Sequence, residues 1–160
     1  MTRDPTGDDP PRVLLDVMCG ALARYLRFCG YDAAYALDEG VEDDDRLAAL
    51  AAAEKRTLLT RDRELAARVD DSLLLTERDV LDQLREVADA GYPVSIATEP
   101  TRCGSCNGPL ERVDGAADPP SYVPDDPRPR WRCRDCGQWF WKGSHWASVA
   151  ERVAGIGADG

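Results

Sequence analysis

Aspartates follow two apolar runs in this sequence, and their placement could support metal chemistry. Asp16 lies near the end of the run 12–17, RVLLDV, and Asp62 comes just after the run 56–60, RTLLT. Asp43–Asp45 open an alanine-rich segment between them. Converging carboxylates repel one another unless a cation lies between them, and oxygen ligands without His or Cys suit Mg²⁺ or Mn²⁺. Such an ion can activate a water and stabilise the charge that develops in phosphodiester cleavage.

The same aspartates have a second interpretation as helix caps. Asp before a helix is an ordinary N-cap, and carboxylates in the first turn complement the helix dipole. Asp62 and Asp43–Asp45 both stand at the start of helical patterns. Asp16 is harder to explain in this way, because a carboxylate at the end of an apolar strand must find a partner. Spacing alone leaves both interpretations open.

Four cysteines form the strongest local pattern in the chain. They make two C-x-x-C pairs with 26 residues between them: Cys103, Cys106, Cys133 and Cys136. Four thiolates in two tight turns match one tetrahedral Zn²⁺ in a closed, structural site, and Gly104 and Gly137 would ease the turns. The spacer exceeds the usual 15–20 residues, and its DPPSYVPDDPRPR stretch predicts a loop at the tip of a ribbon. A redox role would suit one such pair and does not explain two.

Aromatic residues gather around the second cysteine pair. All four tryptophans lie between Trp131 and Trp146. Trp139 and Trp141 would share a strand face on which bases could stack, or they fill the interface between the ribbon and the rest of the chain. His145 is the only histidine. The four-cysteine site does not need it, so it is a candidate for phosphate contact or proton transfer, or for a structural hydrogen bond.

Three arginines lie where they could contact an RNA backbone. Arg61 directly precedes Asp62. Arg24 and Arg27 share the polar face of the helix that follows Asp16, with Arg24 roughly 11 Å along its axis. Such a face is also ordinary solvated surface, so these two residues have a structural interpretation as well.

The elements that must position these residues alternate along the first part of the chain. The patterns predict strands at 12–17, 31–37, 56–60 and 72–76, helices at 18–29, 42–55, 62–69 and 77–90, and a further extended segment at 93–98. Short links between alternating elements imply right-handed crossovers and a mostly parallel sheet flanked by helices, the α/β class. Ligand sites in such sheets form outside the carboxyl ends of the strands, where Asp16 and Asp62 lie.

The composition changes at Glu99–Pro100, which marks a domain boundary. From there the chain is rich in Cys, Pro, Trp and Arg, and no helical period returns until about Trp146. We therefore expect four parts: a disordered tail at 1–11, an α/β domain at 12–98, a zinc ribbon at 99–146 and a C-terminal tail at 147–160.

The net charge of −10 arises from 21 Asp and 9 Glu against 18 Arg and 2 Lys, which suggests a halophilic host. This charge repels nucleic acid at long range, so a nucleic-acid role needs a local basic patch. The segment 101–145 supplies one candidate, with seven basic residues against six acidic ones. No apolar run approaches the roughly 18 residues of a membrane helix. The first eleven residues lack an apolar signal core, so we expect no membrane and a cytoplasmic protein.

Four stretches together resemble the Mut-seven C-terminal ribonuclease domain family, in the same order over residues 12–146. They are LLDVMCGALARYLRFCGYD, LLTRDREL, RCGSCNGPLERV and WRCRDCGQWFWKGSHW. The resemblance implies a PIN-like nuclease fold joined to a zinc ribbon, and metal-dependent cleavage of RNA. Family members often have Leu-Gly where this chain has Cys19-Gly20. A fourth acid has no clear match, and Asp79 is a weak candidate.

The resemblance also implies which acids form the catalytic metal site. It matches Asp16 to the acid after the first strand and Asp62 to the acid of LLTRD. The acid of the second helix matches best at Asp44, with Leu47 and Ala51 following, although the triple aspartate run leaves a one-residue ambiguity.

Two functions fit these features, and a third fits them poorly. The first is a Mg²⁺- or Mn²⁺-dependent ribonuclease whose zinc ribbon helps to hold RNA. The second is a non-catalytic RNA-binding adaptor whose aspartates only cap helices. The third, a receiver-like signalling domain, needs adjacent acids at strand one and a strand-end lysine. Asp16 stands alone, and Lys55 and Lys142 fit neither place. The protein partners stay unknown.

Overall fold

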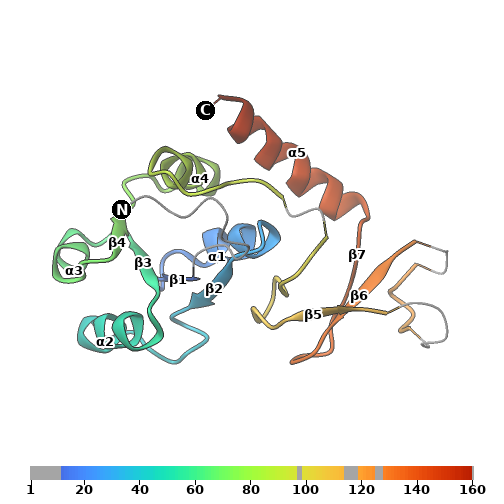
Figure 1. Cartoon of the computed structure of the whole chain (residues 1–160), viewed down its shortest axis with the longest axis horizontal. Coiled ribbons are helices and arrows are strands. Elements are labelled where there is room, and N and C mark those ends of the chain that lie inside the picture. Colours follow the sequence, from blue (N-terminus) through green and yellow to red (C-terminus); the bar gives the residue numbers. More distant parts are fainter. Residues whose placement is uncertain (1–11, 97–98, 114–118, 125–127, 160) are drawn as a thin grey trace.

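The computed structural model describes residues 12–96, 99–113, 119–124 and 128–159. It begins with a four-stranded parallel sheet in the order β2-β1-β3-β4 (Figure 1). The strands are β1 (Arg12–Leu15), β2 (Asp32–Tyr35), β3 (Thr57–Thr60) and β4 (Ser72–Leu74). The tail expected at 1–11 lies outside the described residues. The predicted α/β class and parallel sheet are confirmed.

Helices cover both faces of this sheet. They are α1 (Gly20–Phe28), α2 (Asp44–Glu54), α3 (Arg63–Arg68) and α4 (Val80–Asp89). Side chains alternate across a strand, so Val13 and Leu15 pack with α1 and α4, whereas Leu14 packs with α2 and α3 on the other side. Each fully buried Leu or Val contributes roughly 1.5–3 kcal/mol. The two clusters hold helices on both faces of the sheet.

The second half of the chain forms a small antiparallel sheet. Its strands are β5 (Leu110–Arg112), β6 (Arg130–Cys133) and β7 (Trp139–Trp141), in the order β5-β6-β7. The two cysteine pairs lie in the turns next to these strands, as a zinc ribbon requires. Trp131 and Trp139 are buried. Trp139 therefore serves as apolar filler, as one of the two interpretations predicted for Trp139 and Trp141, whereas Trp141 is only half-buried.

The expected C-terminal tail at 147–160 is largely a helix. Residues Ser144–Asp159 form α5, which runs back from the ribbon to α4 (Figure 1). Its two glycines at 155 and 157 lower the intrinsic helix propensity. However, Val149, Val153 and Ile156 form one apolar stripe that joins the core with α1 and α4. Tertiary packing thus decides the state of this segment.

The extended segment expected at 93–98 forms no strand over its described residues 93–96. Pro93 instead accepts a hydrogen bond from the hydroxyl of buried Tyr31 at 2.7 Å, and Val94 and Ile96 pack against the core. The division of the chain near residue 98 stays a prediction. In the part of the chain that the structure describes, no helix is long and apolar enough to cross a bilayer.

Candidate active site and metal centre

The carboxyl ends of β1 and β3 bring two of the predicted acids to one edge of the sheet. Leu15 pairs with Leu59 in parallel register, so the residues that follow both strands leave at the same edge. The Asp16 N–H extends this ladder by donating to the Leu59 carbonyl at 3.1 Å. β1 lies between β2 and β3, so this edge is also where the strand order changes direction.

Asp16 is buried, and the bonds it accepts fix its carboxylate. Oδ1 accepts the Val17 N–H at 2.7 Å, and Oδ2 accepts the Thr60 hydroxyl at 2.7 Å. The same Thr60 oxygen accepts the Asp62 N–H at 3.0 Å. Thr60 is completely buried, and it ties the two acids together. The sequence does not single it out, because a threonine at the end of a strand is ordinary β composition.

Asp62 is the N-cap of α3. Its Oδ1 accepts the N–H groups of Glu64 at 3.0 Å and Leu65 at 3.3 Å. The capping interpretation is therefore correct for one oxygen of this carboxylate. Its Oδ2 has no hydrogen bond among the described residues, so capping does not use all the acceptor capacity of the carboxylate.

The three consecutive aspartates at the start of α2 have different partners. Asp43 is the N-cap and accepts the Asp45 N–H, whereas Asp45 pairs with Arg68 on α3. Asp44 differs from both: burial, followed by the charges of Asp62 and Asp16, raises the pKa of its carboxyl. Asp44 is thus within electrostatic range of the other two predicted acids.

The acids are more widely spaced than the cysteines. Within the described residues, the four thiol sulfurs are the group whose ligand atoms all lie within 4.8 Å of one another. Mg²⁺ usually keeps several of its waters and uses only one or two carboxylates directly. The acidic edge therefore fits a partly hydrated hard cation, in which some carboxylates bind through water.

Arg61 lies beside these acids. Its charge lowers the pKa of Cys19, which burial and then the charge of Asp16 raise to about 11. The Nε atom of Arg61 is buried and has no hydrogen-bond partner among the described residues. The side chain therefore brings a positive charge to the acidic edge and retains a donor.

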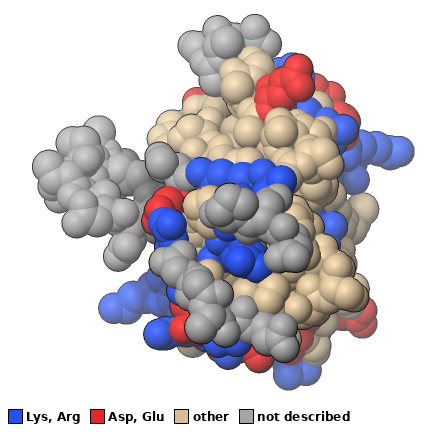
Figure 2. Space-filling model, turned by 90° about the vertical axis from the view of Figure 1, so that its right-hand side faces the viewer, with Lys and Arg blue, Asp and Glu red and all other residues tan. Residues whose placement is uncertain are grey.

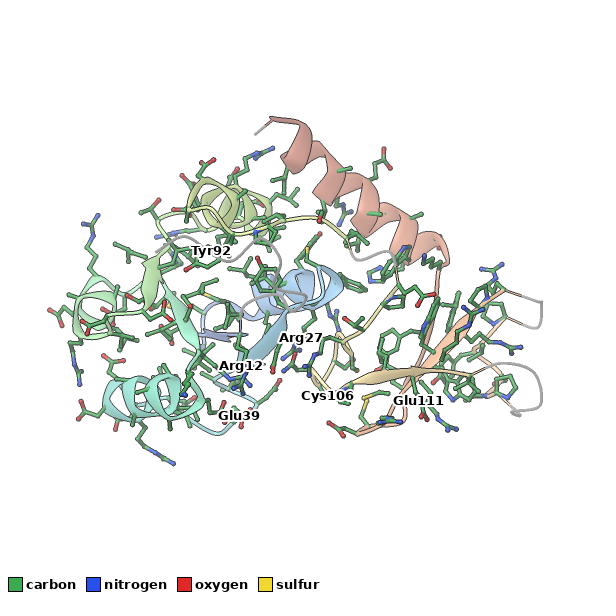
Figure 3. All side chains as sticks on the ribbon, viewed as in Figure 1. Arg12, Arg27, Glu39, Tyr92, Cys106 and Glu111 are labelled. Carbon is green, nitrogen blue, oxygen red and sulfur yellow. The ribbon has the colours of Figure 1, made fainter. Side chains whose placement is uncertain are left out.

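Arg27 has a different role from the one its helix face predicted. Its guanidinium is buried, and it donates from Nε to the Ala33 carbonyl at 3.0 Å and from Nη1 to the Gly104 carbonyl at 2.9 Å. Figure 3 shows it between α1 and the knuckle that holds Cys106. The ribbon covers this part of α1, so the protein's own carbonyl groups hold the Arg27 side chain, and an RNA contact at Arg27 stays a prediction. Arg24 stays exposed.

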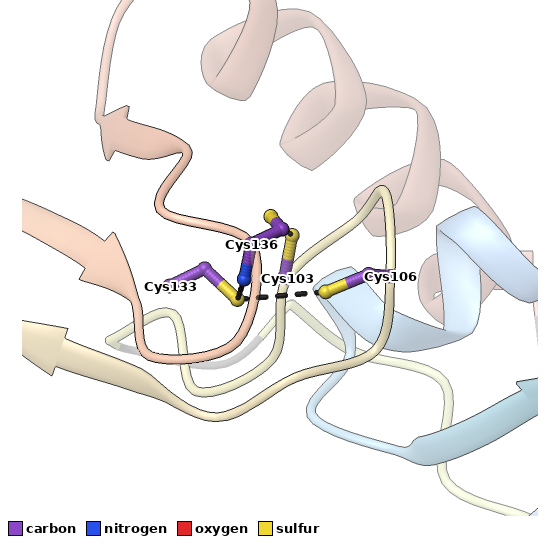
Figure 4. A group of neighbouring side chains, drawn as sticks. All are labelled: Cys103, Cys106, Cys133 and Cys136. Carbon is purple, nitrogen blue, oxygen red and sulfur yellow. Dashed lines mark hydrogen bonds between the residues drawn. The ribbon is translucent and has the colours of Figure 1, made fainter.

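The four cysteine sulfurs form a compact cluster (Figure 4). The sulfurs of Cys103 and Cys136 lie 3.7 Å apart, and those of Cys106 and Cys133 lie 3.5 Å apart. Four Zn–S bonds of 2.3 Å in a tetrahedron require sulfur separations of about 3.8 Å. The observed spacing therefore fits a structural zinc site.

Backbone groups support this centre. The N–H groups of Asp135 and Cys136 point at the Cys133 sulfur, each at 3.4 Å. Burial raises the pKa of the Cys106 thiol to about 12, so a bound cation is needed to hold Cys106 as a thiolate. The first turn relies on Asn107, with a φ of 70°, and on Gly108, where a Cβ would lie 2.8 Å from the Cys133 sulfur. Gly104, expected to ease this turn, has no positive φ.

The first knuckle is docked on the edge of the parallel sheet. Asn107 accepts the Ala33 N–H on β2 at 2.9 Å and donates to Asp32 Oδ1 at 2.7 Å. Arg102 adds an ion pair to Asp32 at 3.6 Å. The unpaired N–H and C=O groups of an edge strand such as β2 are usually covered by another part of the protein. Here the ribbon covers them.

His145 begins α5 beside a cavity of about 260 Å³ between α1, the first knuckle and β7. Its ring lies 5.8 Å from that of Phe28, which also contacts Trp146 at 5.6 Å. Arg24 lines the same cavity. The tertiary structure thus brings two of the predicted RNA-contact residues, Arg24 and His145, to one cavity.

Comparison with known proteins gives one match. A family model described as Mut7-C RNAse domain matches residues 11–153, most of the chain. Neither a search of curated proteins nor a search of solved structures returns a significant match.

Proposed function

The chain belongs to the Mut7-C RNAse domain family, and from this premise we propose that it is a metal-dependent ribonuclease that hydrolyses phosphodiester bonds of RNA. The family description implies RNA as the substrate class. The dependence on Mg²⁺ or Mn²⁺ is our proposal from the ligand chemistry, because the candidate site offers carboxylate oxygens and no His.

One observation carries the proposal most directly. The Thr60 hydroxyl donates to Asp16 at 2.7 Å and accepts the Asp62 N–H at 3.0 Å. A buried carboxylate is costly unless it is paired, and a second acid at the same edge adds repulsion. An arrangement that holds both acids together is expected where a cation offsets that repulsion.

We assign the roles as follows. Asp16, Asp44 and Asp62 would hold Mg²⁺ or Mn²⁺, which supplies an activated water and neutralises charge on the scissile phosphate. Asp16 is fixed by its two accepted bonds. Arg61 would donate to a phosphate oxygen from the side chain whose Nε lacks a partner among the described residues. The zinc ribbon would help to hold the RNA.

A non-catalytic RNA-binding adaptor is the second candidate. The observation that favours it is the pair of bonds from Asp62 Oδ1 to the start of α3, because capping alone explains them. Titration with Mn²⁺ separates the two candidates. A nuclease site binds the ion and loses it on Asp16→Asn, whereas capping carboxylates bind none.

The decisive experiment is cleavage of a defined RNA oligonucleotide by Asp16→Asn and Asp62→Asn. Asn is as good an N-cap as Asp, so Asp62→Asn keeps α3 while it removes the charge. Asp89→Asn is the control, because it removes the same charge from an exposed residue at the end of α4, outside the acidic edge. We expect both site variants to lose activity at least 100-fold and the control to retain it. Equal cleavage by all three, after identical purification, would show that a contaminant or other residues cut the RNA.

The cellular setting also rests on composition. With 21 Asp and only 2 Lys in the chain, a cytoplasmic location in a halophilic host is our proposal. Salt weakens phosphate contacts steeply. Contacts other than basic charge would then contribute a large share of RNA binding.

A further inference from the structure

We propose that the cavity between α1, the first cysteine knuckle and the start of α5 binds one unpaired base of single-stranded RNA. This inference rests on the proposed ribonuclease function and specifies its substrate class. We call this cavity the base pocket; Phe28, Gln138, Trp141 and Trp146 are among the residues that line it.

The walls of the base pocket combine aromatic rings with polar groups. Phe28 meets Trp146 edge to face, with ring centres 5.6 Å apart, and Trp141 and Trp146 are only half-buried. Unlike the buried Trp131 and Trp139, they keep surface for a ligand. A base offers a flat face for such rings, and stacking contributes roughly 1–3 kcal/mol per base.

The polar side of the pocket joins the two knuckles. The Ser105 hydroxyl donates to Gln138 Oε1 at 2.8 Å. This bond connects the turn of Cys103–Cys106 with the segment after Cys136, so the zinc centre holds both residues in place. The Gln138 amide nitrogen has two hydrogens and the Ser105 oxygen two lone pairs. Donors and acceptors of this kind suit the edge of a base and have no counterpart on a plain apolar ligand.

Charge at the pocket also suits RNA. The chain has a net charge of −10, yet Arg24 lines the pocket and the Lys142 ammonium lies 5.7 Å from the centre of the Trp146 ring. Arg24 and Lys142 therefore give the pocket a local positive charge, which favours a polyanion there. Figure 2 looks at the ribbon end and shows that Lys and Arg side chains also gather in the middle of that face.

A second cleft of about 550 Å³ continues from the base pocket along α1. Both are lined by Arg24, Phe28 and His145, and the second reaches Gly20 and Tyr35 at the other end of the helix. The Tyr35 hydroxyl donates to the Val17 carbonyl at 2.6 Å, one residue after Asp16. Burial raises the pKa of Tyr35, and the charges of Asp38 and then of Cys19 and Asp16 add to this shift. The cleft, which Arg27 and Asp38 also line, therefore ends near the backbone next to Asp16, one of the three proposed catalytic acids.

Because the cleft is continuous, the number of nucleotides between the bound base and the cleaved phosphate should be fixed. The nine residues of α1 separate the two ends, a span of roughly 13 Å at 1.5 Å per residue. RNA that inserts one base near Phe28 would place a phosphate a few nucleotides away at the acids. A base inside a duplex must be flipped out before it can enter such a pocket, at a cost of a few kcal/mol. Single strands are therefore preferred.

The test uses the full chain with Asp16→Asn, so that RNA binds without being cut. Single-stranded RNA carrying the fluorescent base 2-aminopurine at successive positions is titrated with this protein. We expect fluorescence quenching to be strongest at one or two adjacent positions. Arg24→Gln and Phe28→Leu should each weaken binding about five- to tenfold, and Phe28→Leu should also remove the position-specific quenching. Arg78→Gln removes the same charge from an exposed site outside the pocket and should change nothing.

Two results would overturn the base pocket and leave the proposed ribonuclease intact. One is equal quenching at every position; the other is unchanged affinity in Arg24→Gln and Phe28→Leu. Equal affinity for a blunt RNA duplex would also contradict the preference for single strands. Failure of the ribonuclease proposal has a different signature, because the chain with intact acids would then bind RNA in the predicted register and never cut it.

Discussion

The Thr60 hydroxyl donates a 2.7 Å hydrogen bond to Oδ2 of Asp16, from the end of β3 to the residue that follows β1. Both residues are buried. Because Thr60 also accepts the Asp62 N–H, one hydroxyl sets the position of two acids that are 46 residues apart in the sequence. The geometry of the acidic edge therefore depends on a residue that carries no charge.

Thr60→Val should impair cleavage while the fold is kept. Valine has the same shape but leaves Asp16 without its donor and the Asp62 N–H without its acceptor, which costs about 1–3 kcal/mol for each buried group. We expect kcat/KM to fall about 10- to 100-fold, since small displacements of reacting groups are expensive. Thr60→Ser retains the hydroxyl and should restore most of the activity. A Thr60→Ser variant as impaired as Thr60→Val would assign Thr60 to packing alone.

Asp44 should be distinguishable from its neighbour by metal binding. Its pKa is raised by burial and by Asp62 and Asp16, so at neutral pH its charge opposes the metal-free fold. Asp44→Asn should raise Tm without divalent ions slightly, by about 1–2 °C, and should abolish the further rise on adding Mn²⁺. Asp43→Asn should keep the Mn²⁺ effect. Thermal unfolding with and without Mn²⁺ measures both, and the reverse pattern would assign Asp43 as the ligand.

Removing one cysteine of the cluster should remove zinc. Metal analysis should find one zinc ion per native chain and almost none in Cys133→Ser, which should also lose at least 3 kcal/mol of unfolding free energy, since structural zinc sites contribute on the order of 10 kcal/mol. Cys29→Ala is the control, because Cys29 is buried in the α/β core and should leave the zinc content unchanged. Native protein that binds no zinc and has four free thiols would refute the centre.

Acid should weaken the docking of the ribbon through Asp32. Burial opposes its ionisation, but bonds from Asn107 and Arg56 and the charges of Arg56 and Arg102 outweigh burial and lower the pKa of Asp32 below 3.8. The folded pKa is depressed, so the stabilisation is present above the ordinary Asp pKa and is lost as pH falls through the folded value.

Asp32→Asn should therefore lower Tm at pH 7 by about 4 °C, and its difference from the native chain should shrink below pH 4. The exposed Asp89→Asn is the control at each pH. A difference that stays constant down to pH 2 would attribute the effect to shape and not to charge.

Several features of this protein follow from the sequence alone. Alternating apolar runs and helical segments predict the parallel sheet, because burial on both faces leaves a local pattern in each strand. The two C-x-x-C pairs predict the zinc site, because each pair of ligands lies within one turn. Asp62 shows the limit of such patterns, since an N-cap and a metal ligand stand at the same place before a helix.

Other features depend on contacts between distant segments, which no local pattern records. The sequence pattern places Arg27 on a helix face that is expected to contact solvent. The docked knuckle covers this side chain, and the Gly104 carbonyl lies 2.9 Å from Nη1 of Arg27. The last turns of α5 contain two glycines and have low intrinsic helix propensity. Packing of its apolar stripe into the core stabilises the helix and directs it back to α4. Thr60 is an ordinary strand residue until β1 brings Asp16 beside it. The sequence therefore determines the alternating elements of the parallel sheet and which ligands are available. Tertiary packing decides the state of α5 and which polar groups meet, because both depend on residues far apart along the chain.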